Sequence, residues 1–279
     1  MRRFFRKLFR LCLLLLLLTG FWYYENCTIQ TEVLPVVSAE LPAAFDGFRI
    51  AVITDLHGRS FGEESSRLLD AVREAGPDII ALDGDIVDES SDLSMLAPLC
   101  RGLSDIAPVF YVTGNHEWRI EQLSQVLDTI ANCGVTVLAN DYRVLTLGES
   151  QIVLAGVHDP NGPYDMRTPE ELTAQIRAAY PDNYLMVLNH RNDALDHWAA
   201  LGADLVISGH GHGGVIRIPG VGGLIGTDRS LFPDYTAGLY TKDGCTLAVS
   251  RGFGFAGIPL RLFNRPELMV LELKAGDRQ

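Results

Sequence analysis

The stretch SGHGHGG, residues 208–214, places two histidines two residues apart among glycines, directly after the apolar run ADLVI. Imidazole is the commonest metal ligand in proteins, and glycine lets the backbone approach a bound group closely. An ordinary polar turn is the alternative for a segment of this composition. His210 and His212 are therefore candidate metal ligands, and the choice between the two interpretations depends on the rest of the chain.

Four more apolar, β-rich runs also end in side chains that can bind a metal. The clusters that follow these runs are Asp55 and His57 in TDLHG; Asp83, Asp85 and Asp88 in DGDIVD; Asn115, His116 and Glu117 in TGNHEW; and His190 in LNHRND. Each cluster also has a simpler explanation, because Asp-x-His can cap a helix and Gly-Asp and Gly-Asn are common turn dipeptides. Ligands of α/β sheets bind beyond the carboxyl ends of the strands, so five such ends together predict one shared site.

The runs that carry these clusters alternate with segments of helical spacing. Buried strands are predicted at 48–54, 78–85 and 108–115, and helices at 63–75, 93–103 and 119–133. Hairpin-linked strands are predicted within 135–157, followed by a helix at 169–179, a strand at 184–190, a helix at 193–201 and a strand at 203–210. The last strands are predicted at 214–218, 235–241, 245–250 and 268–273. This order predicts an α/β fold of stacked sheets flanked by helices in one domain.

Charge and cysteine content exclude several classes of protein. The formal net charge of the 279 residues is −12, although the first ten residues contribute +5, so the remainder carries −17. An acidic body argues against non-specific binding of nucleic acid, which needs a basic face, and it suits the binding of cations. The five cysteines, at 12, 27, 100, 133 and 245, have no CxxC or zinc-ribbon spacing, and their pairing cannot be assigned from the sequence.

The N-terminus combines a basic head, a leucine-rich run and an aromatic end, MRRFFRKLFRLCLLLLLLTGFWYYEN. Fourteen uncharged residues separate Arg10 from Glu25, fewer than the roughly 20 that cross a bilayer. Snorkelling by Arg10 and an aromatic belt at residues 22–24 would extend this length. We therefore predict a membrane anchor at 1–24 with its N-terminus in the cytoplasm and the rest of the chain outside. A cleaved signal peptide is the alternative, but no small-x-small site follows closely.

Together, the five clusters resemble the motifs of the calcineurin-like metallophosphoesterases. The matching residues are Asp55-x-His57, Gly84-Asp85-x-x-Asp88, Gly114-Asn115-His116-Glu117, His190 and Gly209-His210-x-His212, within a resemblance that covers about residues 46–273. The segments SRGFG and IPLRLFNRPEL resemble a membrane-anchored bacterial branch, similar to UDP-2,3-diacylglucosamine pyrophosphatases and broad phosphodiesterases. The resemblance implies a four-layer α/β/β/α sandwich of two mixed sheets at 46–275, preceded by an N-terminal hydrophobic helix at 1–24 and by a linker and edge strand at 25–45.

The same resemblance implies two divalent metal ions, Mn, Fe or Zn. It places one ion on Asp55, His57, Asp85 and His212, and the second on Asp85, Asn115, His190 and His210. Two ions about 3.5–4 Å apart can clamp both the attacking and the leaving oxygen of a phosphate ester. Mixed carboxylate, imidazole and amide ligands suit these metals. His116, which is not needed as a ligand, is then the catalytic residue that faces the leaving group, and Asp85 acts in catalysis as the bridging ligand.

Several neighbouring residues are candidates for supporting roles. Asp88 or Glu117 is expected to orient His116 or a metal-bound histidine. Arg59 and Arg191 each stand beside a ligand block and could grip a phosphate oxygen, although a surface arginine with a carboxylate partner is the alternative for each. His158 follows a further strand end without a motif. The sequence DHWAAL places His197 on a predicted helix, where a structural role is expected.

These features predict a membrane-tethered phosphohydrolase that cleaves phosphodiester or pyrophosphate bonds by attack of a metal-bridging hydroxide. The expected substrate is a phosphorylated small molecule or a lipid-linked compound, and no nucleic-acid partner is expected. One alternative is a lipid-precursor hydrolase like the UDP-2,3-diacylglucosamine pyrophosphatases, against which an outward-facing site argues. Another is a non-catalytic metal-binding protein of the cell envelope, which would be expected to have lost some ligands. The oligomeric state is not determined by these patterns.

Overall fold

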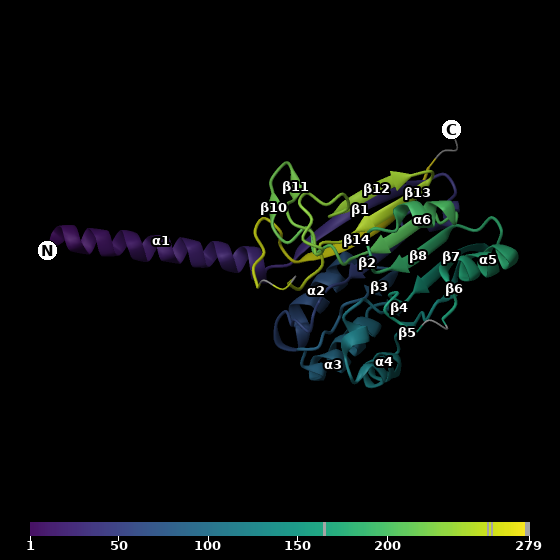
Figure 1. Cartoon of the computed structure of the whole chain (residues 1–279), viewed down its shortest axis with the longest axis horizontal. Coiled ribbons are helices and arrows are strands. Elements are labelled where there is room, and N and C mark those ends of the chain that lie inside the picture. Colours follow the sequence, from purple (N-terminus) through teal and green to yellow (C-terminus); the bar gives the residue numbers. More distant parts are fainter. Residues whose placement is uncertain (164–165, 256, 258, 277–279) are drawn as a thin grey trace.

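The computed structural model describes residues 1–163, 166–255, 257 and 259–276. Two six-stranded sheets pack face to face, and helices cover their outer faces (Figure 1). The first sheet contains, in spatial order, β1 (Gln30–Ser38), β14 (Glu267–Ala275), β2 (Arg49–Ile53), β3 (Ile79–Asp83), β4 (Val109–Val112) and β5 (Thr136–Val137). The second contains β12 (Gly238–Lys242), β13 (Cys245–Val249), β9 (Leu205–Ser208), β8 (Leu185–Asn189), β7 (Ser150–Val157) and β6 (Asp141–Leu147).

Both sheets are mixed, as predicted. In the first sheet β2, β3, β4 and β5 run parallel, while β14 is antiparallel to β2. In the second sheet β7, β8, β9 and β13 run parallel, and antiparallel strands close both edges. The parallel strands therefore end at a common edge of each sheet, which is where ligand sites of α/β proteins form.

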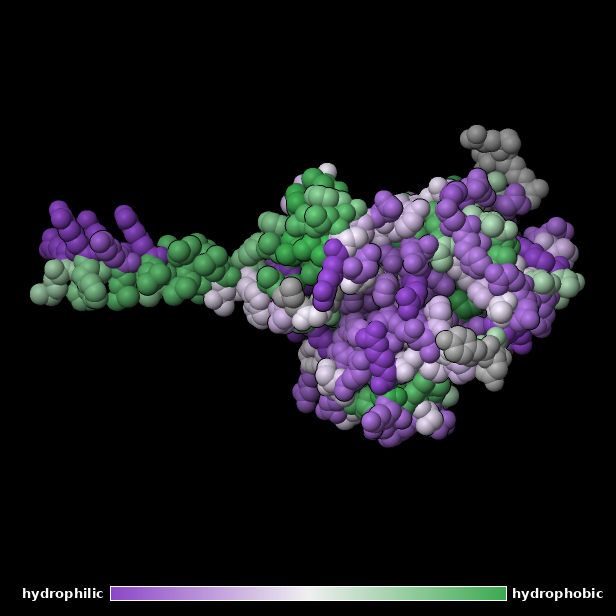
Figure 2. All heavy atoms as spheres, viewed as in Figure 1, coloured by the Kyte–Doolittle hydropathy of each residue, from purple (hydrophilic) through white to green (hydrophobic). Residues whose placement is uncertain are grey.

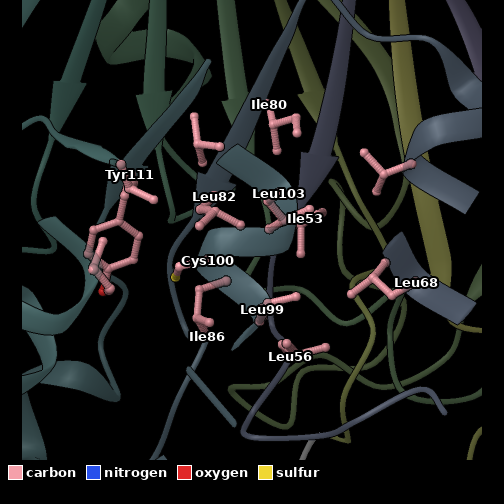
Figure 3. Close-up of a cluster of buried hydrophobic side chains, with 14 of the residues drawn as sticks. Ile53, Leu56, Leu68, Ile80, Leu82, Ile86, Leu99, Cys100, Leu103 and Tyr111 are labelled. Carbon is pink, nitrogen blue, oxygen red and sulfur yellow. The ribbon is translucent and has the colours of Figure 1, made fainter. Parts of the chain in front are cut away.

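Three apolar cores separate the layers. The central core lies between the sheets and includes Ile50, Val52 and Phe110 from the first sheet and Met186 and Ile207 from the second. The outer face of the first sheet packs on α2 (Ser66–Ala75), α3 (Leu96–Ser104) and α4 (Leu123–Asn132), through a core that Figure 3 shows around Ile53, Leu82 and Leu99. The second sheet packs on α5 (Pro169–Ala179) and α6 (Leu195–Ala200). The predicted α/β/β/α layering is confirmed.

Most predicted element bounds differ by a few residues, and two differ for a reason connected with the site. The predicted helix at 119–133 begins at Leu123, because Glu117–Arg119 form a separate 3₁₀ turn directly after Asn115 and His116. The predicted strand at 214–218 shrinks to β10 (Arg217–Ile218), paired with β11 (Gly222–Gly223). Residues 212–215 all have positive φ angles, which are incompatible with a strand. The backbone conformations of the strand-end clusters therefore make the following helix and strand shorter than predicted.

The N-terminal segment forms one helix, α1 (Arg2–Cys27), that projects from the body (Figure 1). No helix of the described residues is sufficiently long and apolar to cross a membrane. The predicted single-pass anchor and the orientation derived from it are therefore not supported. The physical reason is length: at 1.5 Å per residue, the uncharged stretch between Arg10 and Glu25 covers about 21 Å, less than the roughly 30 Å of a bilayer core.

A buried ion pair links the two sheets where the chain passes from β13 to β14. Both carboxylate oxygens of Glu267 contact Arg251, with the backbone N–H donating at 2.7 Å and the guanidinium at 2.7–2.8 Å. Both side chains are almost completely buried, so removal of Glu267 takes away the one buried carboxylate that compensates the charge of Arg251. The guanidinium also reaches Glu32 on β1 at 3.3 Å. The pair thereby connects the end of β13 in the second sheet to the start of β14 in the first.

We predict that Glu267→Ala lowers the free energy of unfolding by about 3 kcal/mol, because it leaves the buried Arg251 with only the more exposed Glu32 as an acidic partner. Denaturation in urea measures this loss. Glu272→Ala, on the same strand, is the matched control, since Glu272 pairs with Arg49 and Lys274 near the surface and exposed pairs contribute little. Equal losses in the two variants would show that burial of the ion pair is not what matters.

Candidate metal centre

The carboxyl ends of five strands from both sheets meet in one place. Asp55 and Asp85 each lie two residues after a strand, β2 and β3 respectively, and Asn115 follows β4. From the second sheet, His190 directly follows β8 and His210 follows β9. The strand-end clusters that the sequence singled out are thus neighbours in space, although they come from two different sheets.

The side chains form overlapping groups with metal-binding geometry. The ligand atoms of three groups lie within 4.8 Å of one another: Asp55, His57 and His212; Asp85, His190 and His210; and His57, Asp85 and His116. The first two groups contain six of the seven residues that the resemblance implies as ligands. Asp85 and His57 each belong to two of the three groups, so the groups share members and form one continuous cluster. The clusters are consistent with a binuclear metal site.

Individual distances show how closely these atoms converge. His212 Nε2 lies 3.4 Å from Asp55 Oδ1 and 3.3 Å from His57 Nε2. His190 Nε2 lies 3.2 Å from Asp85 Oδ2. Asp55 and Asp85 are 0% and 1% exposed. Carboxylates buried to this degree need compensating positive charge.

The electrostatics of the cluster favour bound cations. Burial opposes ionisation of Asp85, but the nearby His190 outweighs it and holds the pKa of this carboxyl below its usual value. Burial lowers the pKa of His212 to about 3 and also lowers that of His210. These imidazoles are therefore neutral at pH 7 and have lone pairs available for a metal.

Unsatisfied polar atoms provide a direct test of whether the residues fit a metal. Asn115 Oδ1 and His190 Nε2 are buried and make no hydrogen bond within the described residues. His190 Nδ1 donates to the carbonyl oxygen of Asp83 at 2.7 Å, so Nε2 is the nitrogen that faces the site and would bind a metal. A buried acceptor without a donor is costly, and a metal ion would satisfy both atoms. The residues therefore fit the implied ions.

The backbone at the site has unusual conformations. Asp55, His57, Asp85, His210 and His212 all have φ angles between 46° and 61°. This left-handed region is uncommon for residues other than glycine, and departures of this kind cluster at functional sites. Adjacent glycines leave room for the turns: a Cβ on Gly114 would collide with Asp85, and one on Gly209 with Thr54 and Asp55. The glycines of the motifs thus allow the ligand side chains to approach the backbone of neighbouring turns.

Asp88 and Glu117, the two predicted orienting residues, have different roles. Asp88 Oδ2 lies 3.3 Å from His57 Nδ1, so it orients a candidate metal ligand, one of the alternatives left open by the sequence. Glu117 does not contact the ring of His116. Its carboxylate accepts the backbone N–H groups of Asp85, Ile86 and Gly114 at 2.7–2.9 Å. Burial, followed by the charge of Asp85, raises the pKa of Glu117 to about 7.

The partner of His116 was not predicted from the sequence. His116 Nδ1 lies 3.0 Å from Glu89 Oε2, and its ring meets that of His57 edge-to-face at a centroid distance of 4.8 Å. Its backbone N–H donates to Asp85 Oδ1 at 2.8 Å. Glu89 belongs to a polar loop, DESSD, whose composition contains no signal that separates a functional glutamate from a solvated one.

Arg191 has the carboxylate partner of the structural alternative, whereas Arg59 is engaged by backbone carbonyl oxygens and an aromatic ring. Arg191 forms a two-point ion pair with Asp159, at 2.6 and 3.1 Å. Arg59 donates to the carbonyl oxygens of Asn26 and Phe253 and stacks on Phe61. Both guanidinium groups are therefore engaged by protein.

The remaining two histidines are likewise accounted for by structural contacts. His158 Nδ1 accepts the backbone N–H of Thr113, and burial lowers its pKa to about 4. His197 lies on α6, where its Nε2 is 3.6 Å from Glu170, as expected for a structural residue.

Comparisons with known proteins identify the family. The model of the family described as calcineurin-like phosphoesterase matches residues 48–214, and the chain belongs to this family. It is 31% identical over 235 residues to phosphodiesterase YaeI of Escherichia coli (strain K12), covering 81% of this chain and 82% of the relative. It is 29% identical over 262 residues to the uncharacterised metallophosphoesterase YkuE of Bacillus subtilis (strain 168), covering 91% and 88%.

A solved structure shares the fold. The crystal structure of TT1561 of Thermus thermophilus superposes with a TM-score of 0.51 at 14% identity, covering 74% of this chain and 90% of that chain. At this identity the likeness concerns the fold alone. It agrees with the two mixed sheets and flanking helices described above.

We predict that Glu117→Ala lowers the free energy of unfolding by about 3 kcal/mol or more, because three buried N–H groups lose their acceptor and each costs about 1–3 kcal/mol. Glu117→Gln keeps one acceptor oxygen and should lose less. Urea denaturation provides the measurement, with Glu121→Ala, an exposed glutamate in the same loop, as the control. If Glu117→Ala were as stable as this control, the carboxylate would not be holding the Asp85 turn.

Proposed function

We propose that this chain is a binuclear-metal phosphohydrolase that acts on phosphodiester bonds. The observation that carries the proposal is the pair of ligand groups, Asp55–His57–His212 and Asp85–His190–His210, which lie together at the strand ends. Membership of the calcineurin-like phosphoesterase family supports hydrolysis of a phosphoester. The relative from E. coli is named as a phosphodiesterase, which favours a diester over a pyrophosphate.

The proposed ligands of one ion are Asp55, His57, Asp85 and His212, and those of the other are Asp85, Asn115, His190 and His210. Two such ions, when bound, supply an acidified water as nucleophile and a clamp for the phosphate oxygens. Mn, Fe and Zn suit the mixture of carboxylate, imidazole and amide donors. A non-catalytic relative would be expected to lack some of these ligands, whereas all seven positions are filled here.

The surrounding residues hold the ligands in position. Asp88 fixes the ring of His57 through Nδ1, and the carbonyl of Asp83 does the same for His190. His210 donates its backbone N–H to both oxygens of Asp55, at 3.0 and 3.1 Å. Partners of this kind set the orientation and tautomer of the ligand.

His116 is placed to act on the leaving group. Its side chain is 29% exposed, unlike the buried ligands, and it lies beside His57 and Asp85. Glu89 holds Nδ1, so Nε2 is the nitrogen that can hold a proton near the leaving oxygen. General acid catalysis of this kind contributes about 10²–10⁴-fold to a rate.

We predict that removal of metal with a chelator abolishes hydrolysis of bis(p-nitrophenyl) phosphate and that Mn²⁺, Fe²⁺ or Zn²⁺ restores it. In Asp85→Asn the rate should fall by more than about 100-fold. Even the loss of a residue that only hydrogen-bonds to a metal ligand lowers metal affinity or activity by about 10–100-fold. Metal content, measured by mass spectrometry, should fall in parallel. Wild-type turnover by the metal-free chain would refute the proposal, and p-nitrophenyl phosphate measured alongside it would show whether monoesters are preferred.

We predict that His116→Ala retains both metals but loses about 100-fold or more in kcat on a diester with a poor leaving group. The loss should be smaller for p-nitrophenol, which leaves without protonation. His197→Ala is the matched control, because this histidine lies on α6 and contacts Glu170 rather than any candidate ligand. Full activity of His116→Ala on the poor leaving group would exclude the proposed role.

A further inference from the structure

The first part of α1 has two chemically distinct sides. Its five basic residues, at positions 2, 3, 6, 7 and 10, recur at helical spacing and share one side. Phe4, Phe5 and Leu8 lie on the other side and are exposed. Figure 2 shows the basic side chains gathered along one edge of the helix and apolar ones along the opposite edge. A basic amphipathic helix of this kind is typical of a segment that lies in a lipid–water interface.

The rest of α1 continues the apolar surface up to the body. Leu13 to Leu18 are all exposed, and Trp22, Tyr23 and Tyr24 follow in the last two turns of the helix and are also exposed. Tryptophan and tyrosine are enriched at the level of lipid headgroups, because each ring joins an apolar body to a polar group. The basic residues, the leucines and the aromatic residues of α1 are therefore the types expected in a helix that binds a lipid surface.

A second group of exposed apolar side chains lies where α1 joins the body, and we call it the apolar tip. Its members are between 37% and 69% exposed and are Ile218, Val221, Leu231, Phe232, Leu260 and Phe263. Figure 2 shows an apolar surface here, over β10 and β11 and next to the end of the helix. Phe21 of α1 contacts Phe263 with a ring-centroid distance of 5.9 Å. The tip and the helix thus form a continuous apolar surface, and such patches mark interaction sites.

Hydrogen bonds fasten the end of α1 to the body. Asn26 Oδ1 accepts the backbone N–H of Arg261 at 2.6 Å, and its backbone oxygen accepts from Arg59. Glu25 accepts the backbone N–H of Asn264 at 3.2 Å. Asn26 is completely buried. The helix therefore has a defined direction relative to the tip.

The same loop connects the apolar tip to the metal centre. Asn264 Nδ2 donates to the backbone oxygen of His212 at 2.7 Å and to that of Val215 at 3.1 Å. His212, Val215 and Leu260 lie close together next to Asn264. A surface that contacts the tip is therefore adjacent to a candidate metal ligand.

We infer that α1 and the apolar tip bind together to an anionic lipid surface, and that the metal centre acts on amphiphilic phosphodiesters held in that surface. Charge complementarity identifies the occupant: α1 carries five positive charges and no acidic residue before Glu25. The remainder of the chain has a net charge of −17 and is repelled by anionic headgroups. The protein therefore approaches the lipid surface with the side that carries the helix and the tip. This contact occurs at the surface of the lipid and needs no crossing helix. The assignment of substrate rests on the proposed function, whereas the lipid contact does not.

Flotation of the full chain with lipid vesicles tests the contact. Binding should be strong to phosphatidylcholine vesicles that contain phosphatidylglycerol, weaker to phosphatidylcholine alone, and reduced by salt. Replacing Arg2, Arg3 and Arg6 by glutamine should weaken binding to the anionic vesicles by about 100-fold, from the usual contribution of each cation near such a surface. Equal binding to both kinds of vesicle, or no binding at all, would overturn the inference.

A double variant tests the apolar tip. Leu231→Ser with Phe232→Ser should weaken vesicle binding by about tenfold or more, because two exposed apolar side chains no longer enter the lipid. The matched control is Val37→Ser with Leu147→Ser, two exposed apolar residues on β1 and β6, and it should bind like the wild type. Thermal unfolding verifies that both variants fold. Equal weakening in both would overturn the inference, as would tip-dependent self-association without vesicle binding, which would assign the surface to a second copy of the chain.

The wild-type chain separates this inference from the proposed function. We expect vesicles to raise the rate on a long-chain alkyl p-nitrophenyl phosphodiester embedded in them, and to leave the rate on soluble bis(p-nitrophenyl) phosphate unchanged. Failure on the soluble diester with intact vesicle binding would refute the proposed function but not the lipid contact. Activity on the soluble diester with no gain on the embedded one would refute the substrate assignment alone.

Discussion

The burial of two carboxylates between the sheets is the constraint on which this structure depends. Asp55 and Asp85 are withdrawn from water at the point where strands from both sheets end. Charges in such a place are tolerated only when paired and hydrogen-bonded. Imidazoles from several loops and the backbone N–H groups of His116 and His210 supply these partners, while the carboxylate of Glu117 accepts the backbone N–H of Asp85 and so holds its turn. The fold can close around this site only because so many polar groups converge there.

This requirement explains the local irregularities of the chain. The ligand residues adopt left-handed backbone conformations, and neighbouring glycines leave room for them. Regular structure is lost around the site for the same reason. Residues 212–215 are not part of β10, and α4 begins only after the 3₁₀ turn at Glu117–Arg119. The cost of these conformations is offset by the large apolar cores on either side. Strain is thus concentrated at the position where the chemistry is proposed to occur.

The C-terminal loop segment, described at residues 250–255, 257 and 259–266, connects features that are otherwise far apart. It is held between the sheets by Arg251 and Glu267, it supports His212 through Asn264, and it receives the end of α1 at Arg261. Arg261 is itself buried and donates to the backbone oxygens of Gly254, Asn264 and Arg251. A single loop therefore relates the direction of the N-terminal helix to the position of a candidate metal ligand.

The sequence by itself determined the clusters and the elements that carry them. Apolar runs ending in His210, Asp85 or Asn115 were recognisable because strand periodicity, turn residues and metal-binding side chains all lie within a few neighbouring positions. Tertiary structure alone decided the rest. Glu117 was expected to orient a histidine but instead accepts backbone N–H groups of the Asp85 turn. No sequence pattern indicated that Glu89 would contact His116.

The same distinction applies to the larger elements. The parallel pairing of β1 with β14 joins residues 30–38 to residues 267–275, and nothing in either segment specifies the other. The hydrophobic N-terminus forms a helix, as expected. Its short uncharged stretch argues against a crossing helix, and its two-sided charge pattern and its attachment at Asn26 determine how it is oriented on the body. Local sequence patterns predict secondary structure and turns, which depend on residues close in the chain. Which distant groups meet is decided by packing and by the need to satisfy every buried charge and hydrogen bond.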